Sequence, residues 1–176
     1  LSEEEGLGEL TLSGWFRTIC EQGADAEALV WYDGGLDGGE RISWSYARMW
    51  DEANAVARAL IGCGIGKGTR VGILMTNRPE FLAATFGVAL AGGVATTLST
   101  FSTPAELEHL IGVSGVSVLL LERQVLKKDF AAMVAEIDPA VASGTAGAIA
   151  SIKYPFWSHV AALGEATGAI EDWASF

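Results

Sequence analysis

Short apolar runs alternate along the middle of the chain with longer segments in which apolar side chains recur every three or four positions. RVGILM at 70–75 and VSVLLL at 116–121 are two such runs, with little polar alternation. Runs of this kind are typical of strands buried on both faces, and the wider spacing is typical of helices. The pattern therefore predicts an α/β fold, a parallel-rich sheet flanked by helices, built from repeated strand–helix units.

The same spacing locates the individual elements. Strands are expected at 28–32, 41–43, 70–75, 94–98 and 116–121, and helices at 11–22, 45–62, 79–91, 104–113 and 125–137. The first two strands flank a glycine-rich turn at 34–39 and predict a hairpin. We expect three regions: 1–39 with a helix and the hairpin, an α/β core at 40–138, and a linker and tail at 139–176. A last strand is expected at 149–152, and Trp157 and Trp173 are expected to anchor the tail.

Polar residues mark the expected helix starts. Ser43 is the predicted N-cap of the helix at 45–62, and Asn77 that of the helix at 79–91. Thr103-Pro104-Ala105-Glu106 predicts a capping box with proline at the first helical position. The helix at 79–91 is expected to bury Phe81, Leu82, Phe86 and Leu90, and the helix at 125–137 to bury Leu126, Phe130, Met133 and Ile137.

Charge and cysteine content narrow the class of protein. The net charge of −11 argues against nonspecific binding to nucleic acid or to an anionic membrane surface. Cys20 and Cys63 form no disulfide framework, and the sequence opens without a basic and then apolar leader. We therefore expect a cytoplasmic protein.

The segment from Phe81 to Ala105 carries no charge, which raises the question of a membrane span. Gly92-Gly93 interrupts it, and the apolar part before these glycines is shorter than the roughly 20 residues that a spanning helix needs. We expect a helix buried against the sheet and no transmembrane span.

The glycine-rich run GCGIGKG at 62–68 does not match a phosphate loop. The pattern G-x-G-x-x-G fails in every register, and Gly66-Lys67 is followed by Gly68 where a P-loop has Ser or Thr. The run also follows a helix, whereas phosphate loops lead from a strand into a helix N-terminus. It is interpreted as a helix stop. Ligand sites of parallel sheets lie beyond the carboxyl ends of the strands, here at 76–78, 99–103 and 122–125.

Several short motifs follow one another across residues 40–137. They are Ser43-Trp44-Ser45-Tyr46 before a helix, Ala57–Leu60 within it, Gly64–Val71 after it, then Thr76-Asn77 and Ala91–Leu98. In order and spacing they resemble the adenylate-forming (AMP-dependent) superfamily, and specifically the N-terminal subdomain of its acyl-CoA synthetases. Tyr46 replaces the acidic capping residue of that family, and Thr97 stands where proline is common.

The resemblance implies an acid–thiol ligase. Such an enzyme joins a small carboxylic acid to the α-phosphate of ATP, releases pyrophosphate, and transfers the acyl group to CoA. The family's catalytic motifs include a Ser/Thr/Gly-rich phosphate loop with P-K-G, an aromatic-Thr-Glu segment and a lysine of a mobile C-terminal domain, and none of them occurs in this sequence. SGTAG at 143–147 is similar to the core of the phosphate loop, but Ala148-Ile149-Ala150 stands where Pro-Lys-Gly would follow.

We therefore expect the chain to be an incomplete N-terminal part of an acyl-CoA synthetase fold. The full-length enzyme would use ATP, Mg²⁺ and CoA, and the fragment is expected to be inactive, with no cofactor bound and no metal ligand or catalytic residue of its own. Apolar surface left exposed on it favours a homo-oligomer.

The resemblance also nominates CoA-binding positions. Ser99, Thr100 and Phe101 correspond to a segment beside the CoA adenine, and Arg123, Lys127 and Lys128 follow the strand that precedes a phosphate contact. Guanidinium and ammonium groups suit phosphate. The alternative for these residues is a capping loop and a solvated basic turn.

Two other functions remain open from the residues alone. One is a noncatalytic interaction or assembly module derived from the same fold, and the other is a self-contained flavodoxin-like binding protein. The second lacks a phosphate-binding loop of its own. A T-S-G-T-T-G-x-P-K-G loop after Phe176 in a longer reading frame would favour the ligase over the module.

Overall fold

A five-stranded parallel sheet forms the centre of the molecule, with the strand order β4-β3-β5-β8-β9. The computed structural model describes residues 11–35 and 38–176. The start of the predicted N-terminal region, residues 1–10, and residues 36–37 of its turn lie outside the described residues. The strands are β3 (Arg70–Leu74), β4 (Val94–Thr97), β5 (Val118–Glu122), β8 (His159–Leu163) and β9 (Ile170–Asp172). The predicted α/β class with a parallel-rich sheet is confirmed.

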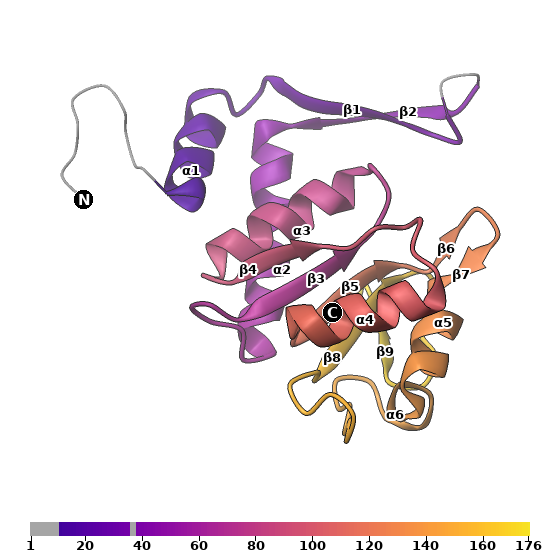
Figure 1. Ribbon diagram of the computed structural model, residues 1–176. Coiled ribbons are helices and arrows are strands. Elements are labelled where there is room, and N and C mark those ends of the chain that lie inside the picture. The colour runs from indigo at the N-terminus through magenta and orange to yellow at the C-terminus, as the bar shows by residue number, and fades with distance from the viewer. Residues whose placement is uncertain (1–10, 36–37) are drawn as a thin grey trace.

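Alternate side chains of the sheet enter two separate apolar cores. In β5, Val118 and Leu120 pack on one face, whereas Leu119 and Leu121 pack on the other. Helices α1 (Leu12–Gln22), α2 (Tyr46–Gly62) and α3 (Pro79–Leu90) cover the first face. Helices α4 (Pro104–Ser114), α5 (Phe130–Ile137) and α6 (Pro139–Ser143) cover the second, so the sheet lies between two helical layers (Figure 1). Burial on both faces explains why β3 and β5 are almost wholly apolar.

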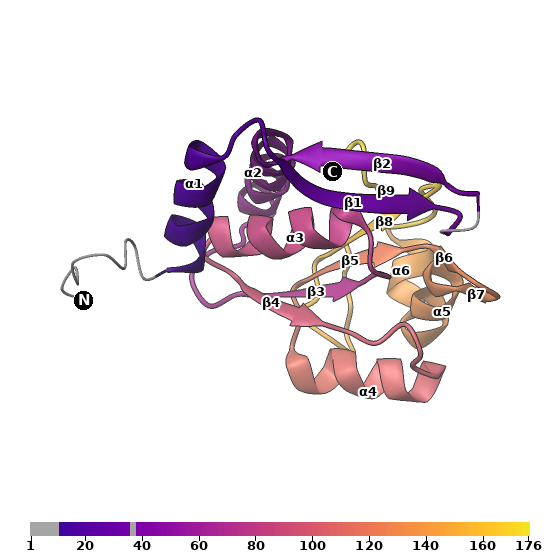
Figure 2. The ribbon, with the colours of Figure 1, turned by 90° about the horizontal axis from the view of Figure 1, so that it is seen from above.

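Two hairpins extend from this three-layer body. Strands β1 (Glu27–Asp33) and β2 (Glu40–Ser45) pair antiparallel, as predicted, and Figure 2 shows them on the side of α1, α2 and α3. The shorter hairpin of β6 (Gln124–Val125) and β7 (Lys128–Asp129) follows the carboxyl end of β5.

Helix α3 packs through its small side chains, contrary to the sequence expectation. Ala83, Ala84, Gly87 and Val88 are buried, whereas the predicted inward residues Phe81, Leu82, Phe86 and Leu90 are only partly buried. Small residues let α3 approach α2 closely, because a Cβ at Gly87 would lie 2.7 Å from the Cβ of Val56. The larger side chain of Phe86 packs against α1 instead, where it stacks on Phe16 with ring centroids 3.9 Å apart.

Two predicted helix caps are wrong and one is confirmed. Ser45 caps α2, because its hydroxyl accepts from the backbone N–H of Arg48, while Ser43 lies within β2 and donates to Glu27. Asn77, the predicted N-cap of α3, does not occupy that position. Arg78 does, and its side chain makes no cap hydrogen bond. The capping box of Thr103 and Glu106 at the start of α4 is present.

The helix predicted at 125–137 begins only at Phe130. Asp129 caps it, with the carboxylate accepting from the N–H of Ala132 at 2.9 Å. Residues 124–129 form the β6–β7 hairpin instead. Leu126, expected in the core, is 95% exposed and has a positive φ of 55°.

The tail completes the sheet. No strand forms at 149–152, where Ile152 is 96% exposed. Strand β8 pairs with β5, and β9 extends the sheet beyond β8, so the region expected as a linker and tail contributes two strands to the α/β core. Trp157 is 1% exposed and Trp173 packs on the opposite core, as anchors of this segment. Among the described residues, no helix has the length and apolar character required to cross a bilayer.

We predict that Gly87→Ala destabilises the protein by about 1–3 kcal/mol, because the added methyl group forces α2 and α3 apart. Gly112→Ala in α4 is the matched control, since its Cβ would meet only Tyr154 at 3.6 Å. Higher helix propensity should make that control neutral or up to about 1 kcal/mol more stable. Urea unfolding of both variants checks the prediction, and a Gly87→Ala protein as stable as wild type would contradict it.

Candidate functional site

The loops that leave β3, β4 and β5 meet at one edge of the sheet, because parallel strands present their carboxyl ends together. This edge carries the three segments that the sequence pattern indicated, 76–78, 99–103 and 122–125. Ligand sites of open parallel sheets lie at this position. We therefore take it as the candidate functional site.

A carboxylate at the end of β5 organises the edge. Glu122 accepts from the backbone N–H of Thr76 at 3.0 Å, from the Thr76 hydroxyl at 2.6 Å and from the Arg78 guanidinium at 2.9 Å. The side chains of Arg78 and Glu122 are 19% and 14% exposed. These bonds tie the turn after β3 to the end of β5.

Arg78 connects this network to Glu80 and to Trp31 of β1. Its Nε donates to Glu80 at 2.7 Å, and its guanidinium lies 5.4 Å from the ring centroid of Trp31 in β1. Burial alone lowers the pKa of Arg78, but the hydrogen bonds and charges of Glu80 and Glu122 outweigh it and leave the pKa raised. The side chain therefore stays cationic and links the β1–β2 hairpin to the edge of the sheet.

A groove of about 710 Å³ opens beside this network, between the loop after β4 and the β6–β7 hairpin. Phe101 on the loop is 86% exposed, and Leu126 on the hairpin is 95% exposed. The groove is lined by Thr76, Thr100, Phe101, Glu122, Gln124, Val125, Leu126, Lys127 and Lys128. It offers apolar surface with a few polar groups, which suits binding of an organic molecule.

The two lysines of the groove differ in their contacts. The ammonium of Lys128 donates to the backbone carbonyls of Thr100 at 3.0 Å and Ser102 at 2.9 Å. Lys127 is exposed and makes no hydrogen bond or ion pair within residues 11–35 and 38–176. Lys127 is therefore the one of the two whose charge is open to a ligand.

Arg123 lies on the other side of the Glu122 network. Its guanidinium donates to the carbonyl of Glu165 at 2.7 Å and lies 3.5 Å from Asp129. It lines a separate groove of about 440 Å³ together with Arg78 and Gly164. The structure thus brings Thr100, Phe101, Lys127 and Lys128 into one groove and leaves Arg123 outside it.

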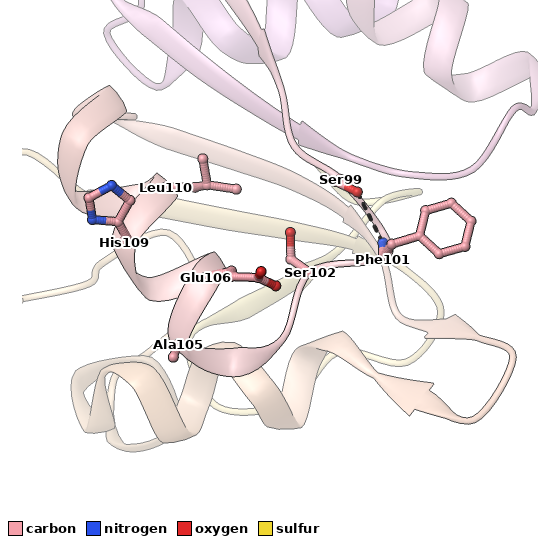
Figure 3. A pocket seen from close by; sticks show the side chains of 7 residues that line it. All are labelled: Ser99, Phe101, Ser102, Ala105, Glu106, His109 and Leu110. Atoms are coloured by element: carbon pink, nitrogen blue, oxygen red, sulfur yellow. Dashed lines mark hydrogen bonds between the residues drawn. The ribbon is translucent and has the colours of Figure 1, made fainter.

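Ser99 does not line the groove beside the hairpin but a neighbouring depression of about 620 Å³, between the loop and α4 (Figure 3). Its hydroxyl accepts from the N–H of Phe101 at 3.2 Å. Figure 3 shows the Phe101 ring pointing away from His109 and Leu110. Glu106 caps α4, and its hydrogen bonds from the backbone and side chain of Thr103 lower its pKa. Phe101 lines both this depression and the groove beside the hairpin.

Sequence reasoning placed these loops correctly but did not identify Thr76, Arg78 and Glu122 as site residues. The available signal was Glu122 itself, a carboxylate that directly ends an apolar run.

Among the residues that the structure describes, no three His, Cys, Asp or Glu side chains cluster as metal ligands. Cys63 is also unsuited to nucleophilic chemistry, because burial and then the charge of Glu171 raise its pKa to about 11.

The amino-acid sequence of this chain is similar to those of known proteins. A family model described as AMP-binding enzyme matches residues 16–165. The chain is 31% identical over 96 residues to the acyl-CoA ligase sidI of Aspergillus fumigatus, covering 54% of this chain and 16% of that protein. It is 35% identical over 80 residues to a Mycobacterium marinum CoA ligase for medium/long-chain fatty acids and 3-oxocholest-4-en-26-oate, covering 46% of this chain and 14% of that protein.

The fold is also similar to that of a solved structure. The crystal structure of the anthranilate CoA ligase AuaEII with anthranoyl-AMP superimposes with a TM-score of 0.74 and 19% identity. The match covers 96% of this chain and 28% of that chain. The chain thus spans less than a third of each protein compared, and its architecture is that of the N-terminal part of adenylate-forming enzymes.

We predict that Glu122→Gln costs about 2 kcal/mol of stability, because Arg78 loses a partly buried charged partner while Glu80 remains. Glu52→Gln is the matched control, since its pair with Arg48 on α2 is 40–55% exposed. Such a surface pair should contribute less than about 0.5 kcal/mol. Thermal or urea unfolding measures both, and equal losses would contradict the role given to Glu122.

Proposed function

The chain belongs to the AMP-binding enzyme family, and we propose that it forms the N-terminal part of an ATP-dependent acyl-CoA synthetase. In the proposed reaction a carboxylate attacks the α-phosphate of ATP, pyrophosphate leaves, and an acyl-adenylate forms. The thiol of CoA then attacks the acyl carbon and AMP leaves, giving the acyl-CoA. The match to the family over residues 16–165 and the named CoA ligases support this assignment.

The catalytic residues, and the groups that would hold ATP and Mg²⁺, are proposed to lie elsewhere in a longer protein. The carboxylates at this edge support that view, because Glu80 and Glu122 are both engaged by Arg78. Among the described residues, no acidic cluster fits a metal ion. On this proposal the chain by itself is inactive and serves as one wall of the enzyme.

We propose that CoA binds at this edge of the chain. The observation that carries the proposal is the open groove at the carboxyl edge, with an exposed phenylalanine and two lysines on its walls. Phe101 presents a ring on which adenine can stack, flanked by Ser99 and Thr100. Lys127 and Lys128 stand on the opposite wall, and Arg123 lies in the next groove along the edge.

The substrate is proposed to be a small carboxylic acid, and the enzyme cytoplasmic. The relatives' names cover fatty acids, a steroid acid and anthranilate, which have the carboxylate in common. Exposed apolar side chains such as Val94 and Val113 are compatible with a homo-oligomer. A noncatalytic module of the same fold is the alternative, and a longer reading frame without a phosphate loop would favour it.

We predict that the purified 176-residue chain releases no pyrophosphate from ATP and a fatty acid above the rate of a protein-free blank. The reason is that the phosphate loop with P-K-G and the other catalytic motifs of the family do not occur in these 176 residues. A coupled pyrophosphate assay with the longer enzyme as positive control checks this. Turnover by the chain alone would contradict the proposal that the catalytic residues lie elsewhere in a longer protein.

We predict that Lys127→Ala and Arg123→Ala each weaken CoA binding by the full-length enzyme about two- to fivefold, the range for one exposed ion pair with phosphate. Lys67→Ala is the control, because Lys67 is exposed in the turn between α2 and β3, at the amino edge of the sheet. Calorimetric titration with CoA measures the affinities. Unchanged affinity in both site variants would refute the CoA assignment.

A further inference from the structure

The loop after β4 has few internal bonds to hold its shape. The hydroxyl of Ser99 accepts from the N–H of Phe101 at 3.2 Å, and the carbonyl of Ser99 accepts from the N–H of Ser102 at 3.1 Å. The carbonyls of Thr100 and Ser102 both accept from Lys128, which lies on a different element. The position of Phe101 therefore depends on a residue 27 places further along the chain.

Lys128 is held firmly at its own end. The neighbouring Asp129 caps α5 through the N–H of Ala132, and its other oxygen accepts from Gln124 at 2.8 Å across the β6–β7 hairpin. The ammonium of Lys128 also lies 5.8 Å from the ring centroid of the buried Phe130. The hairpin is thus fixed to α5, and Lys128 extends from it to the loop.

We infer that Lys128 is a positioning residue, which fastens the loop at 99–102 to the β6–β7 hairpin and so sets the width of the groove between Phe101 and Leu126. Two charge-assisted hydrogen bonds from one half-buried ammonium replace the contacts that the loop does not make within itself. The identity of the ligand rests on the proposed function, but the fastening of the loop does not.

This role differs from that of a phosphate ligand. An ammonium has three donors, and Lys128 uses two of them on protein carbonyls. The adjacent Lys127 is exposed and makes no such hydrogen bonds within the part of the chain that the structure describes. The two lysines therefore have different roles. Lys127 presents a positive charge to the groove, and Lys128 fixes the loop at 99–102 to the β6–β7 hairpin.

The test compares Lys128→Met, Lys128→Arg and Lys127→Met in the 176-residue protein. Methionine keeps an unbranched stem but removes the donors, and arginine retains a cation that can serve both carbonyls. Residue-resolved amide exchange at Phe101 and Ser102 should accelerate about tenfold or more in Lys128→Met, as expected for loss of two charge-assisted bonds. Lys128→Arg should restore most of the protection, and Lys127→Met should leave it unchanged.

A second measurement separates positioning from phosphate contact. CoA affinity of the full-length enzyme is followed against salt concentration for the same variants. Lys127→Met should reduce the salt dependence, whereas Lys128→Met should weaken binding about tenfold and keep the wild-type salt dependence, because its charge does not meet the phosphate.

The outcomes are distinct. Unchanged exchange at Phe101 and Ser102 in Lys128→Met overturns the positioning role, as does a salt dependence reduced as far as in Lys127→Met. Absence of CoA binding by the wild-type enzyme overturns the proposed ligand, while accelerated exchange in Lys128→Met still supports the fastening of the loop.

Discussion

The parallel pairing of β3 with β5 is the constraint on which the rest of the structure depends. Its register places Leu74 opposite Leu121, so that Thr76 and Glu122 emerge side by side where the two strands end. Glu122 then satisfies the turn after β3 and the Arg78 guanidinium together. Without this register the polar groups at the edge would lack partners, and a partly buried charge without a partner is costly.

The edge of the sheet combines a charged network that is closed on itself with an apolar groove that is open. The charges of Arg78, Glu80 and Glu122 pair with one another. These side chains therefore stabilise the loops around the groove. Phe101 and Leu126 instead expose apolar surface that nothing in the described chain covers. The edge thus combines a closed polar network with an open apolar surface, in a chain whose architecture is that of the N-terminal part of adenylate-forming enzymes.

Much of the fold was predictable from the sequence, and the failures have two causes. The strands β3, β4 and β5, the hairpin of β1 and β2, and four of the helices lie where periodicity placed them. Periodicity failed where large and small apolar residues compete for one surface, as in α3, where Gly87 rather than Phe86 faces α2. It also failed at 124–129, where β6 and β7 pair with each other as a short hairpin, and in the tail, where β8 pairs with β5 and β9 with β8.

By itself, the sequence determined best a feature whose hydrogen-bonding partners lie within one turn of chain and whose motif is complete. The capping box of Thr103 and Glu106 is of this kind, because local hydrogen bonds specify it. The apolar run of β5 predicted a buried strand but not the strands with which it pairs. Only the tertiary structure decided which polar residues meet at the site. Arg78 reaches Glu122 across 44 positions and Lys128 reaches Thr100 across 28, and no local pattern encodes such contacts, since they exist only after the strands have paired.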